Sequence, residues 1–316
     1  MCRLNLNDAS SATPVAVRPG SLGAWRVASR PPSLLLAIGP VLSGAALAYA
    51  RTGAMDTWVL GVALFAAVLM QLITNLQNDV GYTARGAEHD GLRVGLPRAT
   101  AMGWLSLVQV RLVVVLLCLF ASMFGLALVV WRGWPVLAIG AASLAAALGY
   151  MGGKRPIAYR PVGELVAFLF FGPVAVMGTD WLLTGSTALC SGLASLALGS
   201  LAAAALAINN HRDRVHDQTT GRRTFAVVWG EAASRRLVHW LVQAPFMVVI
   251  GMALAGWSPW LLLPLILVRN AWCLLREFDR SNAGVALNAV LSQMFRTALW
   301  FAVLLALGAA LSRWLA

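Results

Sequence analysis

The chain has 316 residues, of which 59% are hydrophobic and 11% are charged, and its formal net charge is +12. A water-soluble domain carries about a quarter charged residues, so this composition excludes an ordinary soluble protein and indicates a surface that faces a lipid bilayer. The basic residues lie in short segments between apolar runs rather than on one soluble face, which argues against nucleic acid as a partner and for a topology signal.

Apolar runs long enough to cross a bilayer recur along the chain. Residues 1–30 mix Asn, Ser, Pro and Arg without such a run, so we expect a flexible cytosolic tail there and a single transmembrane domain over 31–316. A membrane helix needs about 20 mostly apolar residues. Nine segments qualify, although two prolines leave the eighth open to another interpretation: 33–50, 57–78, 108–131, 134–150, 164–184, 188–209, 234–256, 258–275 and 292–315. The prediction is an all-α, polytopic membrane protein with about nine transmembrane helices.

The basic residues orient this bundle. With nine crossings, 20 of the 24 Lys and Arg residues fall on the side of the N-terminus, and Arg51, Arg132 and Arg313 fall on the other side. Basic residues favour the cytoplasmic side, so we expect a bacterial-type inner (plasma) membrane protein with a cytoplasmic N-terminus. The long polar segments 79–107 and 210–233 both lie on that side, and long loops in a compact bundle usually carry function. We therefore expect the active site at the cytoplasmic end.

Acidic residues are scarce, and five of the 12 fall in two stretches of these loops. At helical spacing, each stretch places oxygen-bearing side chains on one face. The first face has Asn75, Asn78 and Asp79, with Glu88 and Asp90 further on; the second has Asn209, Asp213 and Asp217. Oxygen ligands of this kind suit Mg²⁺, which combines one or two carboxylates with substrate phosphates. Ionisable groups at membrane helices are costly and are therefore functional candidates.

Arginines are interleaved with these acids, and guanidinium groups bind phosphate oxygens in a bidentate manner. The candidates are Arg85, Arg93, Arg98, Arg212 and Arg223. Together the two stretches predict a metal-bridged diphosphate site. The plainer interpretation is a set of solvated surface ion pairs, and a secondary transporter that coordinates an ion with these residues is a further alternative. Lys154 and Tyr150, at the end of one predicted helix, could contact a second substrate or only anchor the topology.

The second stretch resembles a specific family motif, N-N-x-R-D-x-x-x-D-x-x-x-G-x-x-T-L-x-V-x-x-G. The matching residues are Asn209, Asn210, Arg212, Asp213, Asp217, Gly221, Thr224, Val227 and Gly230, with Phe225 in place of Leu. The motif is typical of the UbiA-type intramembrane aromatic prenyltransferases and, within them, of the dihydroxynaphthoate polyprenyltransferases of menaquinone synthesis. Segments around Arg30-Pro31, Arg93 to Arg98 and Gly163 to Thr179 are similar to the same family, and the likeness spans about residues 25 to 312.

The resemblance implies nine helices around a central lipid-open cavity and Mg²⁺-dependent transfer of a prenyl group from an isoprenoid diphosphate to an aromatic acceptor. It implies that Asp79, Asp213 and Asp217 bind the metal. Asparagines and arginines of both stretches would bind the substrate: Asn75, Asn78, Arg85, Arg93, Arg98, Asn209, Asn210, Arg212 and Arg223. A different aromatic acceptor, or a non-catalytic relative that binds isoprenoid or quinone, stays open as an alternative.

The first stretch departs from the family pattern N-D-x-x-D. Asn78 and Asp79 match, but Tyr82 occupies the position of the second Asp. A phenol does not replace a carboxylate as a hard ligand at neutral pH. Either Glu88 or Asp90 supplies the missing charge, or the first metal is held weakly.

Overall fold

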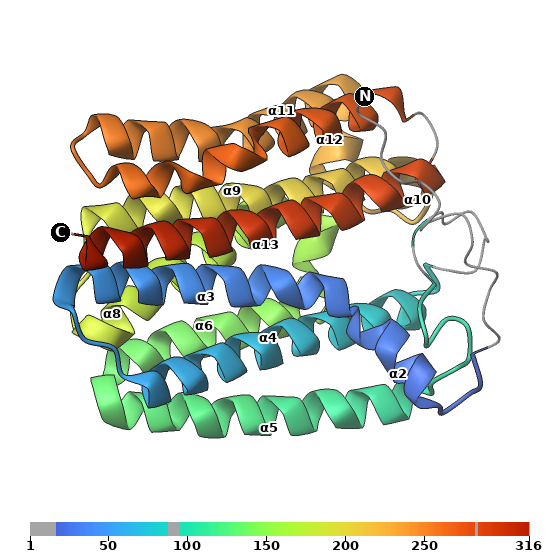
Figure 1. The fold of residues 1–316 in the computed structure, drawn as a ribbon. Helices are drawn as coiled ribbons and strands as arrows, with labels where there is room; N and C mark the ends of the chain where they lie inside the picture. Colours follow the sequence, from blue (N-terminus) through green and yellow to red (C-terminus); the bar gives the residue numbers. More distant parts are fainter. Residues whose placement is uncertain (1–16, 88–94, 96, 282–283, 316) are drawn as a thin grey trace.

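The protein is described by a computed structural model that covers residues 17–87, 95, 97–281 and 284–315. Within these residues it is helical, without strands, and its long helices run side by side along one axis (Figure 1). Eight helical segments are long and apolar enough to cross a membrane. Seven of them are α3 (Pro31–Thr52), α4 (Thr57–Ala84), α5 (Leu107–Arg132), α6 (Trp134–Met151), α9 (Leu189–Arg212), α11 (Phe225–Leu254) and α13 (Gly284–Trp314). The prediction of an all-α polytopic membrane protein is confirmed.

The eighth expected helix, 258–275, is built differently. It consists of the 3₁₀-helix η3 (Pro259–Leu267) followed by α12 (Val268–Arg280), and it runs back along α11 while η3 packs against α13 (Figure 1). Pro264 lacks the N–H that an α-helix needs, and α12 carries five charged residues. Among the described residues, the bundle therefore has eight long apolar spans and one two-part segment instead of nine equal helices.

Part of the expected N-terminal tail is folded. Helix α2 (Leu22–Ser29) begins where Ser21 Oγ accepts a hydrogen bond from the backbone N–H of Ala24 at 3.3 Å, as an N-cap does. Ala24 and Ala28 pack into a cluster with residues of α4. Arg30 then adopts a left-handed conformation, with φ of 49°, before α3 starts at Pro31. This turn places Arg30 at the start of the first membrane span; residues 1–16 lie outside the described part.

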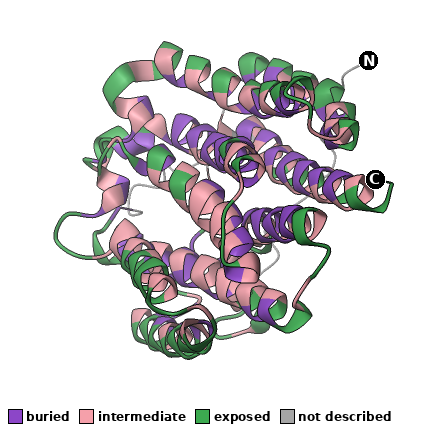
Figure 2. Ribbon diagram, turned by 90° about the vertical axis from the view of Figure 1, so that its left-hand side faces the viewer, coloured by how far each residue is buried: buried purple, intermediate pink, exposed green. Residues whose placement is uncertain are grey.

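Helix α9 is the central helix of the bundle. About two thirds of its membrane-spanning window is buried, since its sequence is dominated by Ala, Gly and Ser, whose small side chains allow close helix packing. It packs against α11, α13 and α3, and it ends at the second acidic stretch. Figure 2 shows the same pattern, with buried positions concentrated on the middle helices and exposed positions on the outer ones. The tightly packed core thus fixes where the second stretch emerges.

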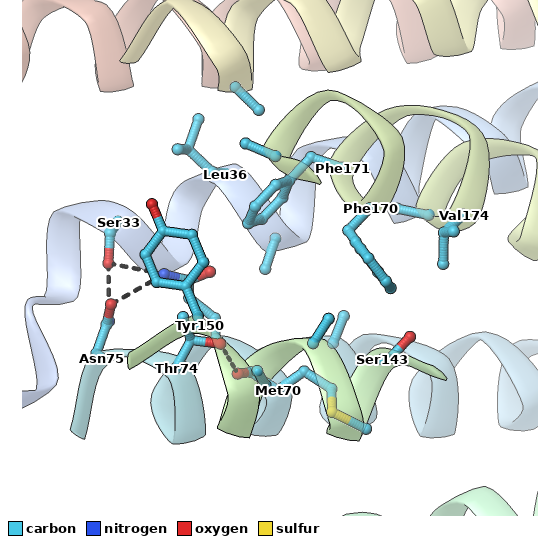
Figure 3. Close-up of a pocket in the computed structure, with 18 of the residues that line it drawn as sticks. Ser33, Leu36, Met70, Thr74, Asn75, Ser143, Tyr150, Phe170, Phe171 and Val174 are labelled. Carbon is cyan, nitrogen blue, oxygen red and sulfur yellow. Dashed lines mark hydrogen bonds between the residues drawn. The ribbon is translucent and has the colours of Figure 1, made fainter. Parts of the chain in front are cut away.

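The remaining apolar span, Gly163–Thr184, is the fifth in chain order and is interrupted by a π-helix. It consists of α7 (Gly163–Leu169), the π-helix η2 (Phe170–Met177) and α8 (Gly178–Thr184). Gly172 lies so close to α9 that a Cβ atom would stand 2.5 Å from the carbonyl oxygen of Ser195, so only glycine permits this approach. π-Helical turns are frequent at functional sites. Here the turn carries Phe170 and Phe171, whose rings point into the interior cavity (Figure 3).

An ion pair between a partly exposed arginine and a buried aspartate connects helices at the other end of the bundle. Arg51 at the end of α3 donates to Oδ1 of Asp180 on α8 at 2.9 Å. Oδ2 of Asp180 accepts from Ser191 Oγ at 2.7 Å and from the backbone N–H of Ala188 at 3.1 Å. Both carboxylate oxygens are therefore satisfied, and the arrangement ties α3 and α8 to the start of α9.

Candidate active site

A cavity of about 680 Å³ lies inside the bundle, and both acidic stretches contribute to its wall. Its long walls are apolar and come from α3, α4, α5, α6, η2 and α9, as the close-up in Figure 3 shows in part. Polar side chains also line it: Arg30, Asn75, Asn78, Tyr82, Arg98, Tyr150, Asn209, Asn210, Arg212, Arg222 and Asn288. One chamber thus combines cationic and amide groups with a wide apolar surface, which suits a ligand with an anionic head and an apolar tail.

Asp79 on α4 is fully buried and is held from two sides. Its Oδ1 accepts from Arg30 Nη2 at 3.3 Å and lies 3.6 Å from Nη1 of Arg98, while Oδ2 accepts from the backbone N–H of Thr100 at 3.2 Å. Arg30 precedes α3 and Arg98 precedes α5 in the chain, so the carboxylate joins three segments. It also keeps two guanidinium groups at the cavity wall.

The two asparagines of the first stretch differ in their bonding. Asn75 donates at 2.8 Å to both Ser29 O and Ser33 Oγ, and its Oδ1 accepts from Gln71 at 3.0 Å. It therefore fastens α4 to the junction of α2 and α3. Asn78, one turn further on, lines the cavity with a buried Oδ1 that has no hydrogen-bond partner among the described residues. Of the two, Asn78 has the oxygen that is open to a ligand.

Arg212 organises the second stretch at the end of α9. It donates to both oxygens of Asp213 at 2.7 Å, to Asn209 Oδ1 at 2.8 Å and to Asn288 Oδ1 of α13 at 2.7 Å. These charge-assisted bonds fix a bidentate guanidinium at the cavity wall. This bond connects Asn288 on α13, which lies 76 residues after Arg212 in the sequence, to the site.

Asp217 lies on the short helix α10 (Arg214–Thr219) and is fully buried. Its Oδ1 accepts from Nη1 of Arg222, whose Nε donates to the carbonyl of Ala158 at 3.2 Å. Oδ2 of Asp217 is buried without a partner. Burial raises the pKa of this carboxyl above its usual range, although the positive charge of Arg222 acts in the opposite direction.

Glu164 at the start of α7 is a further buried acid of the site. Its Oε1 accepts from Nδ2 of Asn210 at 2.8 Å, while its Oε2 and Asn210 Oδ1 are buried without partners. A carboxylate in the first turn of a helix interacts favourably with the positive end of the helix dipole. The structure also connects this one to the cavity through Asn210.

The two stretches meet at Tyr82. Its ring centroid lies 3.5 Å from the guanidinium carbon of Arg98 and 5.0 Å from that of Arg222. The phenol that departs from the family pattern therefore stands between an arginine of the first long loop and an arginine of the second.

Several residues expected at the site lie away from this cavity. Arg85 donates to the carbonyls of Met151 and Gly153 at 2.7 and 2.6 Å. Arg223 and Lys154 are exposed, whereas Tyr150 lines the cavity as expected. Three expected residues lie outside the described part of the chain, namely Glu88, Asp90 and Arg93.

Arg30 and Arg222 are the cavity residues that sequence reasoning did not select. Arg222 was counted only as a topology signal, and Arg30 was counted as a topology signal and as part of a segment similar to the family, without a role in binding. The signal for Arg30 was its place directly before the Pro that starts the first span, and the signal for Arg222 was its distance of five residues from Asp217. Neither signal distinguishes an inward arginine from a surface one.

The donor set can be compared with the needs of Mg²⁺. Among the described residues, no group of three or more His, Cys, Asp and Glu side chains is arranged to hold a metal ion, and each of the three aspartates pairs with arginine. However, Asn78 Oδ1 and Asp217 Oδ2 are buried oxygens without a partner. Such atoms cost about 1–3 kcal/mol each, and a hard cation that also takes substrate phosphates and waters would satisfy them. The residues therefore fit a magnesium ion whose remaining ligands are substrate phosphates and water molecules.

Comparison with known proteins identifies the family of the chain. Residues 37–299 match the UbiA prenyltransferase family. The chain is 33% identical to a 1,4-dihydroxy-2-naphthoate octaprenyltransferase of Escherichia coli, over 93% of this chain and 97% of that one, and 32% identical to the protein of the same name in Mycobacterium tuberculosis, over 78% and 82%. A UbiA homolog from Archaeoglobus fulgidus solved with DMAPP and Mg²⁺ shares the fold, with a TM-score of 0.65, 14% identity and coverage of 90% and 98%. Since the family match extends over most of its length, the chain belongs to the UbiA prenyltransferase family.

Proposed function

We propose that this membrane enzyme transfers a prenyl group from an isoprenoid diphosphate to 1,4-dihydroxy-2-naphthoate in quinone biosynthesis. The observation that carries the proposal is the single cavity in which arginines of both stretches meet long apolar walls. The choice of acceptor is supported by relatives named 1,4-dihydroxy-2-naphthoate octaprenyltransferase, which are 26% to 33% identical to this chain.

The polar residues are proposed to bind the diphosphate. Four arginines line the cavity and would donate to phosphate oxygens: Arg30, Arg98, Arg212 and Arg222. The oxygen ligands of Asp79, Asp213, Asp217 and Asn78 would hold Mg²⁺, with Glu88 and Asp90 as further candidates from the sequence. When bound, Mg²⁺ neutralises negative charge on the departing diphosphate. The arginines perform the same task from fixed positions, because the aspartates already orient their guanidinium groups.

The proposed reaction breaks two bonds and forms one between the substrates. The allylic carbon–oxygen bond breaks and its electron pair leaves with the diphosphate. The electron-rich ring carbon that bears the carboxylate then supplies the pair for the new carbon–carbon bond; the carbon–carboxylate bond breaks, its electron pair returns to the ring, and CO₂ leaves. The protein must keep water from the allylic cation, and the apolar walls around Phe170 and Phe171 provide such an environment.

Tyr150 is proposed to contact the acceptor. It lies at the end of α6 and lines the cavity (Figure 3), and a Cβ added at Gly163, beside Glu164, would stand 3.2 Å from its hydroxyl. A phenol hydroxyl and the amide of Asn210 offer a donor and acceptors for the polar groups of a dihydroxy acid. Arg85, Arg223 and Lys154, proposed from the sequence, would have to reorient to reach substrate.

The site is proposed to open to the cytoplasm. The protein is a multi-pass membrane protein by its eight apolar spans, and the acidic stretches lie at the end that carries most of the basic residues. The excess of Lys and Arg on cytoplasmic loops supports this orientation. An inner-membrane enzyme placed in this way would meet its water-soluble diphosphate head groups on the cytoplasmic side.

The decisive assay uses the purified protein in lipid nanodiscs with a radiolabelled prenyl diphosphate and a panel of aromatic acceptors, with Mg²⁺ or with EDTA. We expect label in the prenylated, decarboxylated product of 1,4-dihydroxy-2-naphthoate, and release of diphosphate, only when Mg²⁺ is present. Binding of the labelled diphosphate without its cleavage would indicate a non-catalytic relative. Transfer to another ring in preference to the naphthoate would contradict the assigned acceptor.

A further inference from the structure

Tyr82 connects two cationic groups that come from different parts of the chain. Its ring is 6% exposed and lines the cavity, with the guanidinium carbon of Arg98 at 3.5 Å and that of Arg222 at 5.0 Å from the ring centroid. Both arginines are buried and line the same cavity. The two positive guanidinium groups repel each other, so holding both near the cavity requires groups that attract each of them.

Each arginine is held by an acid and by the ring. Asp79 Oδ1 lies 3.6 Å from Nη1 of Arg98, and Asp217 accepts from Arg222. The face of an aromatic ring attracts a cation electrostatically, yet it adds no net negative charge. A carboxylate at the same place would attract the arginines more strongly but would cancel one positive charge that a diphosphate needs.

We propose that Tyr82 is a positioning residue that arranges Arg98 and Arg222 as a preformed cationic clamp for the diphosphate of the substrate. This inference rests on the proposed function and specifies which groups bind the diphosphate. The clamp gives pyrophosphate affinity that does not depend on a divalent cation. The two fixed guanidinium groups supply the positive charge that would otherwise come from a metal ion bound by a carboxylate at this position. The ring face, rather than the phenol hydroxyl, is the part of Tyr82 that performs this role.

The test measures the affinity of inorganic pyrophosphate for the full chain in nanodiscs, by calorimetry in EDTA and again in Mg²⁺. We expect the wild type to bind in EDTA and Tyr82→Phe to bind within about twofold of it, since the ring face is retained. Tyr82→Leu should bind about tenfold more weakly in EDTA. Tyr82→Asp should lose binding in EDTA and recover it in Mg²⁺.

Tyr159 provides the matched control. Its ring also faces an arginine, with the guanidinium carbon of Arg85 at 5.7 Å from the centroid, but neither residue lines the cavity. Tyr159→Leu should leave pyrophosphate affinity unchanged. In turnover assays, Tyr82→Leu should raise KM for the prenyl diphosphate while KM for the acceptor stays constant.

Each result decides the matter. Equal affinity of wild type and Tyr82→Leu in EDTA overturns the inference, as does a wild type that binds pyrophosphate only with Mg²⁺; both leave the proposed function standing. A wild type that binds pyrophosphate under neither condition overturns the proposed function as well. If Tyr82→Leu does not fold, the comparison of Tyr82→Phe with Tyr82→Asp in EDTA decides in its place, and equal affinity of these two contradicts the clamp.

Discussion

Arg222 and Asp217 form a buried ion pair between the end of α10 and the loop that precedes α11. The side chains are 2% and 0% exposed, and the backbone N–H of Arg222 also donates to the carbonyl of Asp217 at 2.8 Å. The pair therefore closes its own loop while the guanidinium stays at the wall of the cavity. A buried pair of this kind is costly to break, since the remaining partner keeps an uncompensated charge.

Alanine substitutions of the adjacent residues Arg222 and Arg223 should have very different effects. We expect Arg222→Ala to lower kcat/KM about a hundredfold or more, because one preorganised cation at the leaving group is lost. It should also destabilise the protein by about 3–5 kcal/mol, because Asp217 is left unpaired. Arg223→Ala, at the adjacent exposed position, should change neither quantity. Turnover and thermal unfolding in detergent measure the two effects, and a larger loss in Arg223→Ala would reverse the assignment.

Removing a carboxylate of the second stretch should abolish transfer, and the variant should keep its helical fold but unfold at a lower temperature, because a buried arginine is left without its acid. Asp213→Ala or Asp217→Ala removes a proposed metal ligand, so Mg²⁺ should no longer stimulate turnover. Asp279 supplies the control: its carboxylate is half exposed and pairs with His239 at 3.0 Å on the surface of α12, so Asp279→Ala should retain activity. Circular dichroism checks the fold, and normal turnover in Asp217→Ala would rule out its role.

Filling the apolar part of the cavity should affect long prenyl substrates more than short ones. Gly140 on α6 lines the cavity, and a Cβ at this position would meet no atom within 4 Å. Gly140→Phe therefore adds bulk without a backbone clash and should reduce turnover of a long prenyl diphosphate by about tenfold or more relative to a five-carbon one. Gly61 is equally open but lies outside the cavity, so Gly61→Phe should leave the ratio unchanged. An unaltered ratio in Gly140→Phe would place the tail elsewhere.

The acceptor contact can be tested at the end of α6. Tyr150→Leu removes the hydroxyl that lines the cavity, so KM for the naphthoate should rise about tenfold while KM for the diphosphate changes little. Lys154 lies four residues on and is exposed, and Lys154→Ala should behave as the wild type. Steady-state kinetics with each substrate varied in turn distinguish the two. A rise confined to the Lys154 variant would move the acceptor to the surface.

The ion pair at the other end of the bundle should matter for stability alone. Asp180→Ala leaves Arg51, Ser191 and the N–H of Ala188 without their acceptor. We expect a loss of about 2 kcal/mol rather than the full cost of a buried pair, because Arg51 is 35% exposed and can turn to solvent. Thermal unfolding should show a lower midpoint, while kcat of the folded fraction stays constant. A selective fall in kcat would show that this end communicates with the site.

The apolar runs were sufficient to predict the membrane bundle, and the motif around Asn209 pointed to the loop that forms one side of the candidate site. The single helical face expected for Asn209, Asp213 and Asp217 does not form, because α9 ends at Arg212 and Asp217 lies on the separate helix α10. A helix that crosses a lipid bilayer must have a certain length and hydropathy, so membrane helices can be predicted from short stretches of sequence. The segment 258–275 marks the limit of that rule. Its composition is apolar at first, but Pro264 and the charges of α12 divide it into two kinds of helix, and only packing against α11 and α13 sets its course.

What the sequence determined by itself was therefore the environment, the helical class and the chemical inventory of the site. Tertiary structure decided which of two adjacent arginines faces inward. Arg222 follows Gly221, whose φ of 72° turns the chain at that point, and Arg222 is buried against Asp217 and Tyr82 while Arg223 is exposed. The direction of a side chain in a loop depends on backbone angles and on contacts with distant segments, and neither is encoded in the spacing of neighbouring residues.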